Sequence, residues 1–341
     1  MGYVEGNLAR PQGTKFPAVK FGPRRLGHSN NFVGDAIKSA DFFVTVAGFE
    51  EVARELQIPA VFVSNGNTHH DLGLVQCPKG EARIGRGGHV QIPKGRGLVP
   101  GLNHMGWEME HQQQLVEAYY RIKDSDVPIH RLVDHQTSWS VYIFDPDGIL
   151  HEIYADQIKD WRKVLKGDLR NLTGSWNPEE GKPTTARNYH ETFELRTVPN
   201  AIFHPVKITH EVVVCENYDA MVGFYENVIG LTPGFKSPDG NFVSFHGTKS
   251  DLDVALFKPI PGKKSGMHHM AFQCQDEKDL DAAKAKLKAK GLLTLFEVDN
   301  DRKRSIFVAD PDGLGCEFYI RRSAKWDSVA KVDLRQQPYF V

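Results

Sequence analysis

The stretch GLNHMGW at residues 101–107 has a second version, GMHHMAF, at residues 266–272. The tetrapeptide DPDG also occurs twice, at residues 145–148 and 310–313. Both pairs of motifs have the same offset in numbering, which is 165 (269 − 104 and 310 − 145). Two unrelated coincidences would rarely share one offset, so the sequence predicts an internal duplication and a fold made of two copies of one unit.

Weaker matches extend the duplication upstream. LGH at residues 26–28 resembles ITH at residues 208–210, now at an offset of 182 (210 − 28). FF-x4-GF, which begins at residue 42, reappears as FY-x4-GL at the same offset. The first copy therefore has a net insertion of 17 (182 − 165), which we place between residues 77 and 99. Gly, Lys and Arg cluster there without apolar periodicity, which predicts a loop.

These offsets divide the chain into two domains and three other segments. The first copy spans residues 25–156 and the second spans residues 205–322, and each is long enough to bury a core of its own. The rest is an N-terminal arm (1–24), a linker (157–204) with a stretch rich in Gly, Pro and polar residues, and a C-terminal tail (323–341).

Each copy mixes short strands with helices. Residues 140–144 and 211–214 have the pattern of strands, whereas residues 112–122 and 280–290 have helical periodicity. The order is strand, helix and several strands, twice in each copy. In the DPDG tetrapeptides, proline fixes φ at the second position and glycine accepts the last, which predicts a tight turn before a final strand. The fold class is therefore mixed α+β.

The composition is that of an ordinary soluble globular protein, with 341 residues, 40% hydrophobic and 25% charged. Lys and Arg number 42 against 43 Asp and Glu, so no basic field exists to hold nucleic acid or an anionic membrane. No apolar run approaches the length of a membrane span, and residues 1–16 lack the apolar core of a signal peptide. The four cysteines are far apart and form no C-x-x-C pair. We expect a reducing, cytoplasmic setting and neither a nucleic-acid nor a membrane partner.

Residues that can bind a metal stand at equivalent positions of the two copies. They are His28, His104 and Glu152 in the first copy, and His210, His269 and Glu317 in the second. The offset between the last two members is 48 in both sets (152 − 104 and 317 − 269). Two imidazoles and one carboxylate on one face, with other coordination positions open, are typical of non-haem Fe(II) sites, although zinc or manganese also accepts such ligands.

A single histidine on a strand is more often a hydrogen-bonded structural residue than a metal ligand. Three metal-capable residues that recur in both copies favour a metal in at least one of them. The neighbouring His69, His151 and His268 are interpreted as structural residues. Strand alternation directs His151 and His268, which adjoin presumed ligands, to the opposite face.

These motifs resemble those of the vicinal oxygen chelate superfamily, and more narrowly those of the two-domain type I extradiol dioxygenases, which open catechol rings. The resemblance covers both copies. It implies two homologous domains, each built from tandem βαβββ modules that form a half-open barrel. It also implies Fe(II), with Mn(II) as the alternative, held by His28, His104 and Glu152 in the first domain, which is then the catalytic one.

The resemblance further implies catalytic roles for three side chains. His70 begins HDLGL at residues 70–74, which matches the family's acid–base histidine motif. Tyr142 lies ten residues before Glu152, at the spacing of a tyrosine that hydrogen-bonds the substrate, and His135 lies near the place of an assisting histidine. The simpler interpretations are that His70 is a surface residue at a strand end and Tyr142 a half-buried core aromatic.

The second copy departs from this pattern around its triad. The positions of His70, Tyr142 and His135 are taken there by Leu252, Phe307 and Asn300. A phenyl ring cannot donate a proton or a hydrogen bond. The second triad therefore either holds a metal without running the same reaction or is a relic of the duplication. In the two-domain family the C-terminal domain is usually the active one, so this chain is expected to reverse that order.

The predicted function is extradiol cleavage of a catechol-type aromatic diol, with both atoms of O2 inserted, in a protein that forms homo-oligomers as the family commonly does. One alternative is another metalloenzyme of the same fold, such as a glyoxalase-like isomerase or a thiol transferase of the fosfomycin-resistance kind. A second is a metal-free protein that sequesters a ligand, like the bleomycin-resistance members. Glu152 is followed by Ile-Tyr-Ala rather than by the early glycine common in the dioxygenases, which is a departure from the narrow family.

Overall fold

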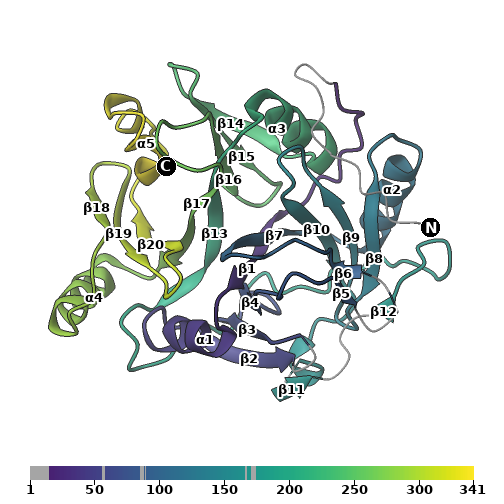
Figure 1. The fold of residues 1–341 in the computed structure, drawn as a ribbon, viewed down its shortest axis with the longest axis horizontal. Coiled ribbons are helices and arrows are strands. Elements are labelled where there is room, and N and C mark those ends of the chain that lie inside the picture. Colours follow the sequence, from purple (N-terminus) through teal and green to yellow (C-terminus); the bar gives the residue numbers. More distant parts are fainter. Residues whose placement is uncertain (1–14, 56–57, 85–87, 89, 166, 170–173) are drawn as a thin grey trace.

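The computed structural model describes residues 15–55, 58–84, 88, 90–165, 167–169 and 174–341, so most of the predicted N-terminal arm lies outside the described residues. Within them, four modules of one strand, one helix and three strands follow one another along the chain (Figure 1). The first module consists of β1 (Arg25–Val33), α1 (Ala36–Thr45), β2 (Glu50–Glu55), β3 (Ala60–Ser64) and β4 (Leu72–Gln76). The second consists of β7 (Gly101–Glu108), α2 (Gln112–Lys123), β8 (Ile129–Asp134), β9 (Ser138–Phe144) and β10 (Leu150–Asp156).

The second half of the chain repeats this order. Its first module consists of β13 (Pro205–Val214), α3 (Tyr218–Phe224) with a π-helical turn (Tyr225–Ile229), β14 (Thr232–Lys236), β15 (Phe242–His246) and β16 (Val254–Phe257). Its second module consists of β17 (Gly266–Cys274), α4 (Glu277–Ala289), β18 (Phe296–Asp299), β19 (Lys303–Ala309) and β20 (Gly315–Arg321). The tail that follows contains a 3-10 turn (Val329–Lys331) and the short helix α5 (Gln337–Phe340).

The segment predicted as a linker, residues 157–204, also contributes strands. Residues Gly167–Leu169 form β11, which pairs in parallel with β2, and residues Gly174–Ser175 form β12, which pairs with β8. A 3-10 turn (Trp161–Lys163) precedes them. The segment therefore extends the first sheet at both of its edges.

The two modules of each half share one sheet. The first sheet has the strand order β11-β2-β3-β4-β1-β7-β10-β9-β8-β12 and curves into a half-barrel. The second has the order β14-β15-β16-β13-β17-β20-β19-β18 and is also curled. In both sheets the opening strands of the two modules pair antiparallel at the centre, β1 with β7 and β13 with β17. The predicted α+β fold of tandem βαβββ modules is thus confirmed.

The extra residues of the first copy fold against its sheet. They contain a small hairpin of β5 (Arg83–Ile84) and β6 (Val90–Ile92), where the sequence predicted a loop. Arg96 donates hydrogen bonds to the carbonyls of Gly148 and Asn103, at 2.9 and 2.7 Å. These bonds hold the insertion beside β7, so that it forms a wall of the cavity described below.

Local sequence signals explain where several elements begin. Asp35 accepts hydrogen bonds from the backbone N–H groups of Ile37 and Lys38 and so caps α1. In the DPDG turn, Asp145 accepts from the N–H groups of Asp147 and Ile149, and glycine takes the left-handed conformation at the last position. Both tetrapeptides therefore form the predicted tight turn, and β10 and β20 follow them.

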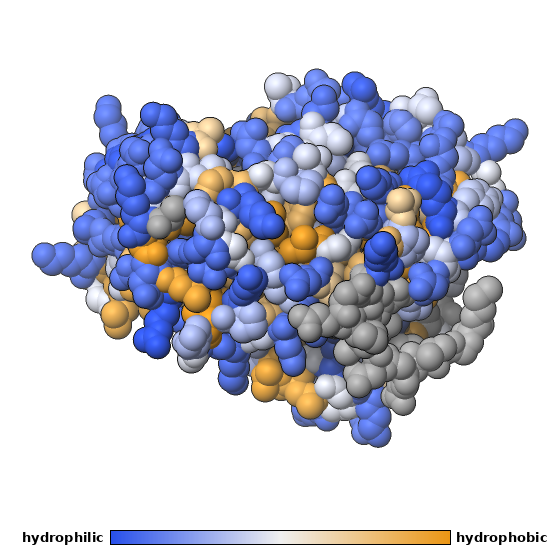
Figure 2. Space-filling view, turned by 90° about the horizontal axis from the view of Figure 1, so that it is seen from above, coloured by the Kyte–Doolittle hydropathy of each residue, from blue (hydrophilic) through white to orange (hydrophobic). Residues whose placement is uncertain are grey.

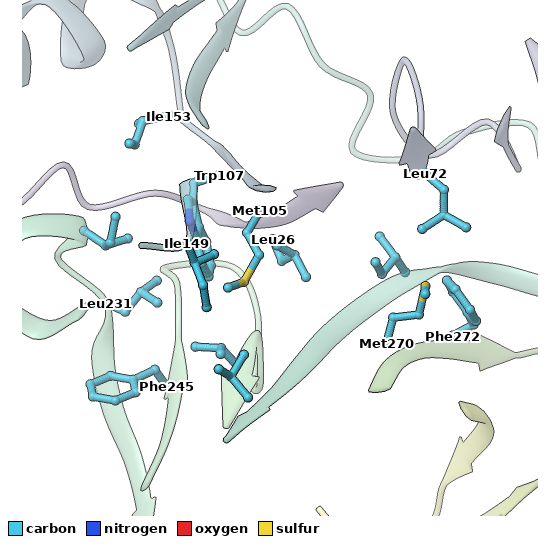
Figure 3. Close-up of a cluster of buried hydrophobic side chains, with 14 of the residues drawn as sticks. Leu26, Leu72, Met105, Trp107, Ile149, Ile153, Leu231, Phe245, Met270 and Phe272 are labelled. Carbon is cyan, nitrogen blue, oxygen red and sulfur yellow. The ribbon is translucent and has the colours of Figure 1, made fainter. Parts of the chain in front are cut away.

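The two halves share one hydrophobic core. Figure 3 shows side chains of both halves in this one cluster, among them Met105 and Trp107 of β7 and Phe245, Met270 and Phe272 of the second half. All five side chains are fully buried. At roughly 25 cal/mol for each Å² of apolar surface removed from water, such shared burial ties the halves together strongly. The halves of the duplication are thus not two independent bodies.

Reciprocal hydrogen bonds also join the halves. The buried Asp71 accepts from the backbone N–H of Ile208 at 3.1 Å, and the buried Asp253 accepts from that of Leu26 at 2.7 Å. Asp71 and Asp253 are equivalent positions of the duplication, as are Leu26 and Ile208. Each aspartate therefore holds the other half's first strand, two residues before its triad histidine.

The outside of the molecule contrasts with this core. The face in Figure 2 is mostly hydrophilic, with small and separate hydrophobic patches. Within the described part of the chain, no helix is both long and apolar enough to cross a membrane.

Candidate metal centre

Three buried side chains of the first half converge on one point. His28 lies on β1, His104 on β7 and Glu152 on β10, and the three are at most 4% exposed. The Nε2 atoms of His28 and His104 each lie 3.1 Å from Oε2 of Glu152. All three ligand atoms lie within 4.8 Å of one another, a spacing that one metal ion can bridge.

Gly106 makes this convergence possible. It lies opposite His28 in the β1–β7 ladder and beside Glu152 in the β7–β10 ladder. A Cβ atom at this position would come within 2.1 Å of His28 Nε2. The glycine of the repeated motif thus leaves the space in which the His28 ring lies.

The charge states suit a divalent cation. Burial lowers the pKa of His28 and lowers that of His104 to about 4, so both imidazoles are neutral near pH 7. Burial raises the pKa of Glu152, but the close approach of the His104, His135 and His28 side chains outweighs burial and leaves the pKa well below its usual range. Neutral imidazoles and an ionised carboxylate are the forms that metal ligands require. His104 Nε2 is buried and makes no well-directed hydrogen bond to the described residues.

A second layer of side chains orients the carboxylate. Ser140 Oγ donates to Oε1 of Glu152 at 2.7 Å, and His135 Nε2 lies 3.4 Å from the same oxygen. The hydroxyl of Tyr142 lies 3.0 Å from His135 Nε2. Burial, followed by the charge of Glu152, raises the pKa of Tyr142 well above 10, so its hydroxyl stays protonated. The sequence-predicted Tyr142 and His135 are therefore in contact with each other and close to Glu152.

Glu152, Tyr142 and His135 line one cavity of the first half. His70 enters it just before β4, and its ring centroid lies 4.1 Å from that of His28. Its Nε2 lies 3.2 Å from Oδ1 of Asn30, which fixes the ring. Burial, together with His28 and His69, lowers the pKa of His70 well below 6.5. The structure thus places a neutral imidazole beside the triad, and not a surface residue.

Sequence reasoning missed several residues of the cavity. Asn30 lies on β1 two positions after His28, and Ser140 lies on β9 two positions before Tyr142. Strand alternation puts such pairs on one face, so this signal could have found them. Arg131 of β8 has its guanidinium 4.0 Å from the centre of the Tyr142 ring and also lines the cavity. Its placement depends on strand register, which the sequence does not reveal.

The histidines interpreted as structural behave differently from one another. His151 Nδ1 accepts from Trp107 Nε1, and its Nε2 lies 3.0 Å from Asp145, on the face away from Glu152. His69 lies 3.6 Å from Asp156, as a structural residue would, but it also lines the cavity. Nitrogen atoms of His28, His69 and His70 lie within 4.8 Å of one another as well. His268 Nδ1 lies 2.8 Å from His269 Nδ1 in the second half.

The second triad is present but has different surroundings. His210, His269 and Glu317 lie on β13, β17 and β20 and are buried, with their ligand atoms within 4.8 Å. The two histidines are 3.7 and 3.4 Å from Oε2 of Glu317, farther than in the first triad. The side chain of Lys303 hydrogen-bonds Oε1 of the same carboxylate.

The residues at the positions equivalent to His70, Tyr142 and His135 make other contacts. Phe307 packs its ring against His269, 5.1 Å away between centroids, and Leu252 packs against the core of the second half. Asn300 Oδ1 accepts from the N–H groups of Arg302 and Lys303 at 2.9 Å. The structure therefore brings no proton-handling counterpart of His70, Tyr142 or His135 to these three positions.

A family model described as the glyoxalase, bleomycin resistance protein and dioxygenase superfamily matches residues 25–153 and 207–318. The chain belongs to this superfamily. The two matched stretches correspond to the two halves of the duplication, and each contains one complete triad.

Solved structures with the same fold include enzymes of more than one kind. The 2,3-dioxygenase LapB from Pseudomonas sp. KL28 superposes with a TM-score of 0.62 and 16% identity, over 90% of this chain and 95% of that one. Homoprotocatechuate 2,3-dioxygenase from Arthrobacter globiformis gives 0.60 and 16%, over 90% and 81%. A Mn(II)-bound glyoxalase from Novosphingobium aromaticivorans gives 0.59 and 17%, over 87% and 82%. Identities this low establish the shared fold alone.

Proposed function

We propose that this chain is a metal-dependent extradiol dioxygenase, which opens a catechol-type aromatic diol with O2 in its first half. The observation that carries the proposal is that the metal-capable triad adjoins a cavity lined by three further proton-handling groups, His70, Tyr142 and His135. The family membership and the similarity to two ring-cleaving 2,3-dioxygenases support it.

The donor set fits Fe(II), with Mn(II) as the alternative. His28, His104 and Glu152 would hold the ion, because they supply two neutral nitrogens and one anionic oxygen from rigid strands. When bound there, the ion would supply Lewis-acid and redox chemistry for a reaction between a diol and O2. Ser140 would keep the Glu152 carboxylate in its orientation, as partners of metal ligands generally do.

His70 would move protons. Its imidazole is neutral in the buried cavity, so it can take the proton of a diol hydroxyl and later return a proton to an oxygen of the product. Asn30 holds the His70 ring, and Phe62 packs edge-on against it at 5.0 Å between centroids. The ring is therefore fixed in position before substrate arrives.

Tyr142 would hydrogen-bond the substrate. Its hydroxyl stays protonated and can donate to a diol oxygen, while His135 orients the hydroxyl from 3.0 Å away. Because a phenolic hydroxyl in a buried site donates without being ionised itself, this group can recognise an oxygen that becomes more negative during the reaction.

The remaining wall of the cavity suits an aromatic ring. Apolar side chains come from several elements, including the insertion: Ile58, Phe62, Val75, Ile92 and Leu165. They would hold the ring and exclude water from the reaction. Cleavage between one hydroxylated carbon and its unhydroxylated neighbour, with both oxygen atoms retained in the product, is the expected outcome.

Oxygen uptake tests this proposal. Protein reconstituted anaerobically with Fe(II), and separately with Mn(II), is mixed with O2 and a panel of catechols from the unsubstituted ring to biaryl and fused-ring diols. We expect stoichiometric O2 consumption with a yellow ring-opened product. Glu152→Gln should lose the metal and the activity, and His70→Gln should keep the metal and lose at least about 100-fold in kcat. Glu297→Gln and His190→Gln, at exposed positions, are the matched controls.

Two results would overturn the proposal. One is full turnover by Glu152→Gln. The other is absence of O2 uptake with every catechol although the metal is bound, together with conversion of the hemithioacetal of methylglyoxal and glutathione, which would identify an isomerase.

A further inference from the structure

A buried lysine occupies the second triad. Lys303 opens β19, is 1% exposed, and donates its ammonium to Oε1 of Glu317. The equivalent residue of the first half is Ser138, which is neutral and opens β9. The two triads therefore differ by one full positive charge close to the carboxylate.

That charge changes what the second triad can bind. In the first half the described partners of Glu152 are Ser140 and histidines, so its negative charge is left for a cation. In the second half the ammonium of Lys303 already balances Glu317. A divalent ion placed among His210, His269 and Glu317 would be buried next to a like charge, which low-dielectric surroundings penalise heavily.

The backbone geometry also disfavours a metal ion at the second triad. Ala271 stands where the first half has Gly106, and it lies opposite His210 in the β13–β17 ladder. A methyl group at position 106 would collide with His28, so the second half cannot hold its histidine in the same place. The ring centroids of His210 and His269 are accordingly 6.3 Å apart, against 5.6 Å for His28 and His104.

The surroundings of the second triad are cationic and closed by the chain itself. A cavity of about 450 Å³ beside His210 is lined by six basic residues and two acidic ones, namely Arg25, Lys207, Lys249, Arg302, Lys303 and Arg321 with Asp251 and Asp253. On the other side, Tyr339 of α5 packs on Phe307 and His268, with centroids 5.0 and 4.8 Å apart. The tail thus covers the side of the second triad on which Phe307 stands in the place of Tyr142.

We propose that Lys303 takes the place of a metal ion in the second triad, so that the chain binds one metal, at His28, His104 and Glu152. The His210–His269–Glu317 group is then a lysine–carboxylate pair flanked by two histidines, and it takes no part in the reaction. The inference concerns metal stoichiometry and holds whichever reaction the first half catalyses.

Metal counting tests the inference without any activity assay. Each protein is loaded anaerobically with excess Fe(II) or Co(II), passed through a desalting column, and analysed for metal per chain, with circular dichroism as the check on folding. We expect about one ion for the wild type, about one for Glu317→Gln and none for Glu152→Gln. The double variant Lys303→Ser/Ala271→Gly, which copies the first half at both positions, should bind a second ion, whereas Lys303→Arg/Ala271→Gly, which keeps the charge, should not.

Two outcomes would overturn the inference. The first is two ions in the wild type, with a fall to one in Glu317→Gln. The second is a folded Lys303→Ser/Ala271→Gly protein that still binds one ion. If this double variant does not fold, the comparison of the wild type with Glu317→Gln decides alone.

Discussion

Gly106 lies directly between His28 and Glu152 across the centre of the first sheet, and the space above its Cα is filled by the His28 ring. Gly106, which has no side-chain functional group, therefore determines the geometry of the candidate metal centre.

Replacing Gly106 by alanine should weaken metal binding. The added methyl group would lie 2.1 Å from His28 Nε2, so the ring must move out of the triad. Changes in the residues that position metal ligands typically cost roughly 10–100-fold in metal affinity. Titration with Co(II), followed by absorbance, measures this. Gly174→Ala, where an added Cβ comes no closer than 3.7 Å to another residue, is the control. Equal affinity in the two variants would contradict the role given to Gly106.

Tyr142→Phe should separate metal binding from turnover. The hydroxyl hydrogen-bonds His135 rather than a triad histidine, so we expect an unchanged metal content. Loss of a hydrogen-bond donor to the substrate should lower kcat by roughly 10–1,000-fold. Tyr120→Phe, on the exposed face of α2, is the matched control. A Tyr142→Phe enzyme with wild-type kcat would remove this residue from the proposed mechanism.

Asp253→Ala should weaken metal binding at the triad of the first half, although Asp253 belongs to the second half. It would leave the buried N–H group of Leu26 without its acceptor, at a cost of roughly 1–3 kcal/mol. Because Leu26 precedes His28 by two residues, metal affinity should fall together with the free energy of unfolding. Urea denaturation and Co(II) titration give the two quantities. Asp251→Ala, whose side chain is 79% exposed, should change neither by a measurable amount.

Glu211 should make stability depend on pH. Burial raises its pKa to about 8, with the Ser29 hydroxyl partly offsetting the rise. A raised carboxyl pKa means that the folded state prefers the protonated form. Its contribution is complete below the unfolded pKa of 4.5 and is lost as pH rises through about 8.

Glu211→Gln removes this titration, so it should be more stable than the wild type by roughly 4 kcal/mol at pH 8 and by little near pH 5. Thermal unfolding of both proteins across this range measures the difference. Glu216→Gln, an exposed position just after β13, controls for the general loss of a carboxylate. Parallel curves for Glu211→Gln and the wild type would contradict the prediction.

The duplication could be predicted from the sequence because the spacing between its motifs is the same in both copies even where the residues differ. Two motifs at one offset predicted the repeated modules, and equivalent histidines and glutamates marked the triads that the structure brings together. The strand alternation of β10 also directed His151 correctly away from Glu152. These signals are local, and they depend only on periodicity along the chain.

Contacts between strands that are distant in the chain could not be predicted from the sequence. Lys303 looks like an ordinary surface lysine in the sequence, since lysine is almost never fully buried. Even the pairing of β19 with β20 puts it opposite Arg321, so its bond to Glu317 is visible only in the structure. The hairpin of β5 and β6 has too few apolar residues for a strand pattern. Arg131 reaches the cavity through its pairing with Tyr142 across two strands.

The exchange of hydrogen bonds by Asp71 and Asp253 has a consequence for how this protein can change over generations. Each half supplies an acceptor that the other half's first strand needs, so deletion of either half would leave the survivor with an unsatisfied N–H and an exposed core face. On the proposed function, substitutions in the second triad would leave the reaction of the first half unchanged, whereas loss of the second half's framework would expose the shared core. We therefore expect the second half to be inherited together with the first because the first depends on it for folding.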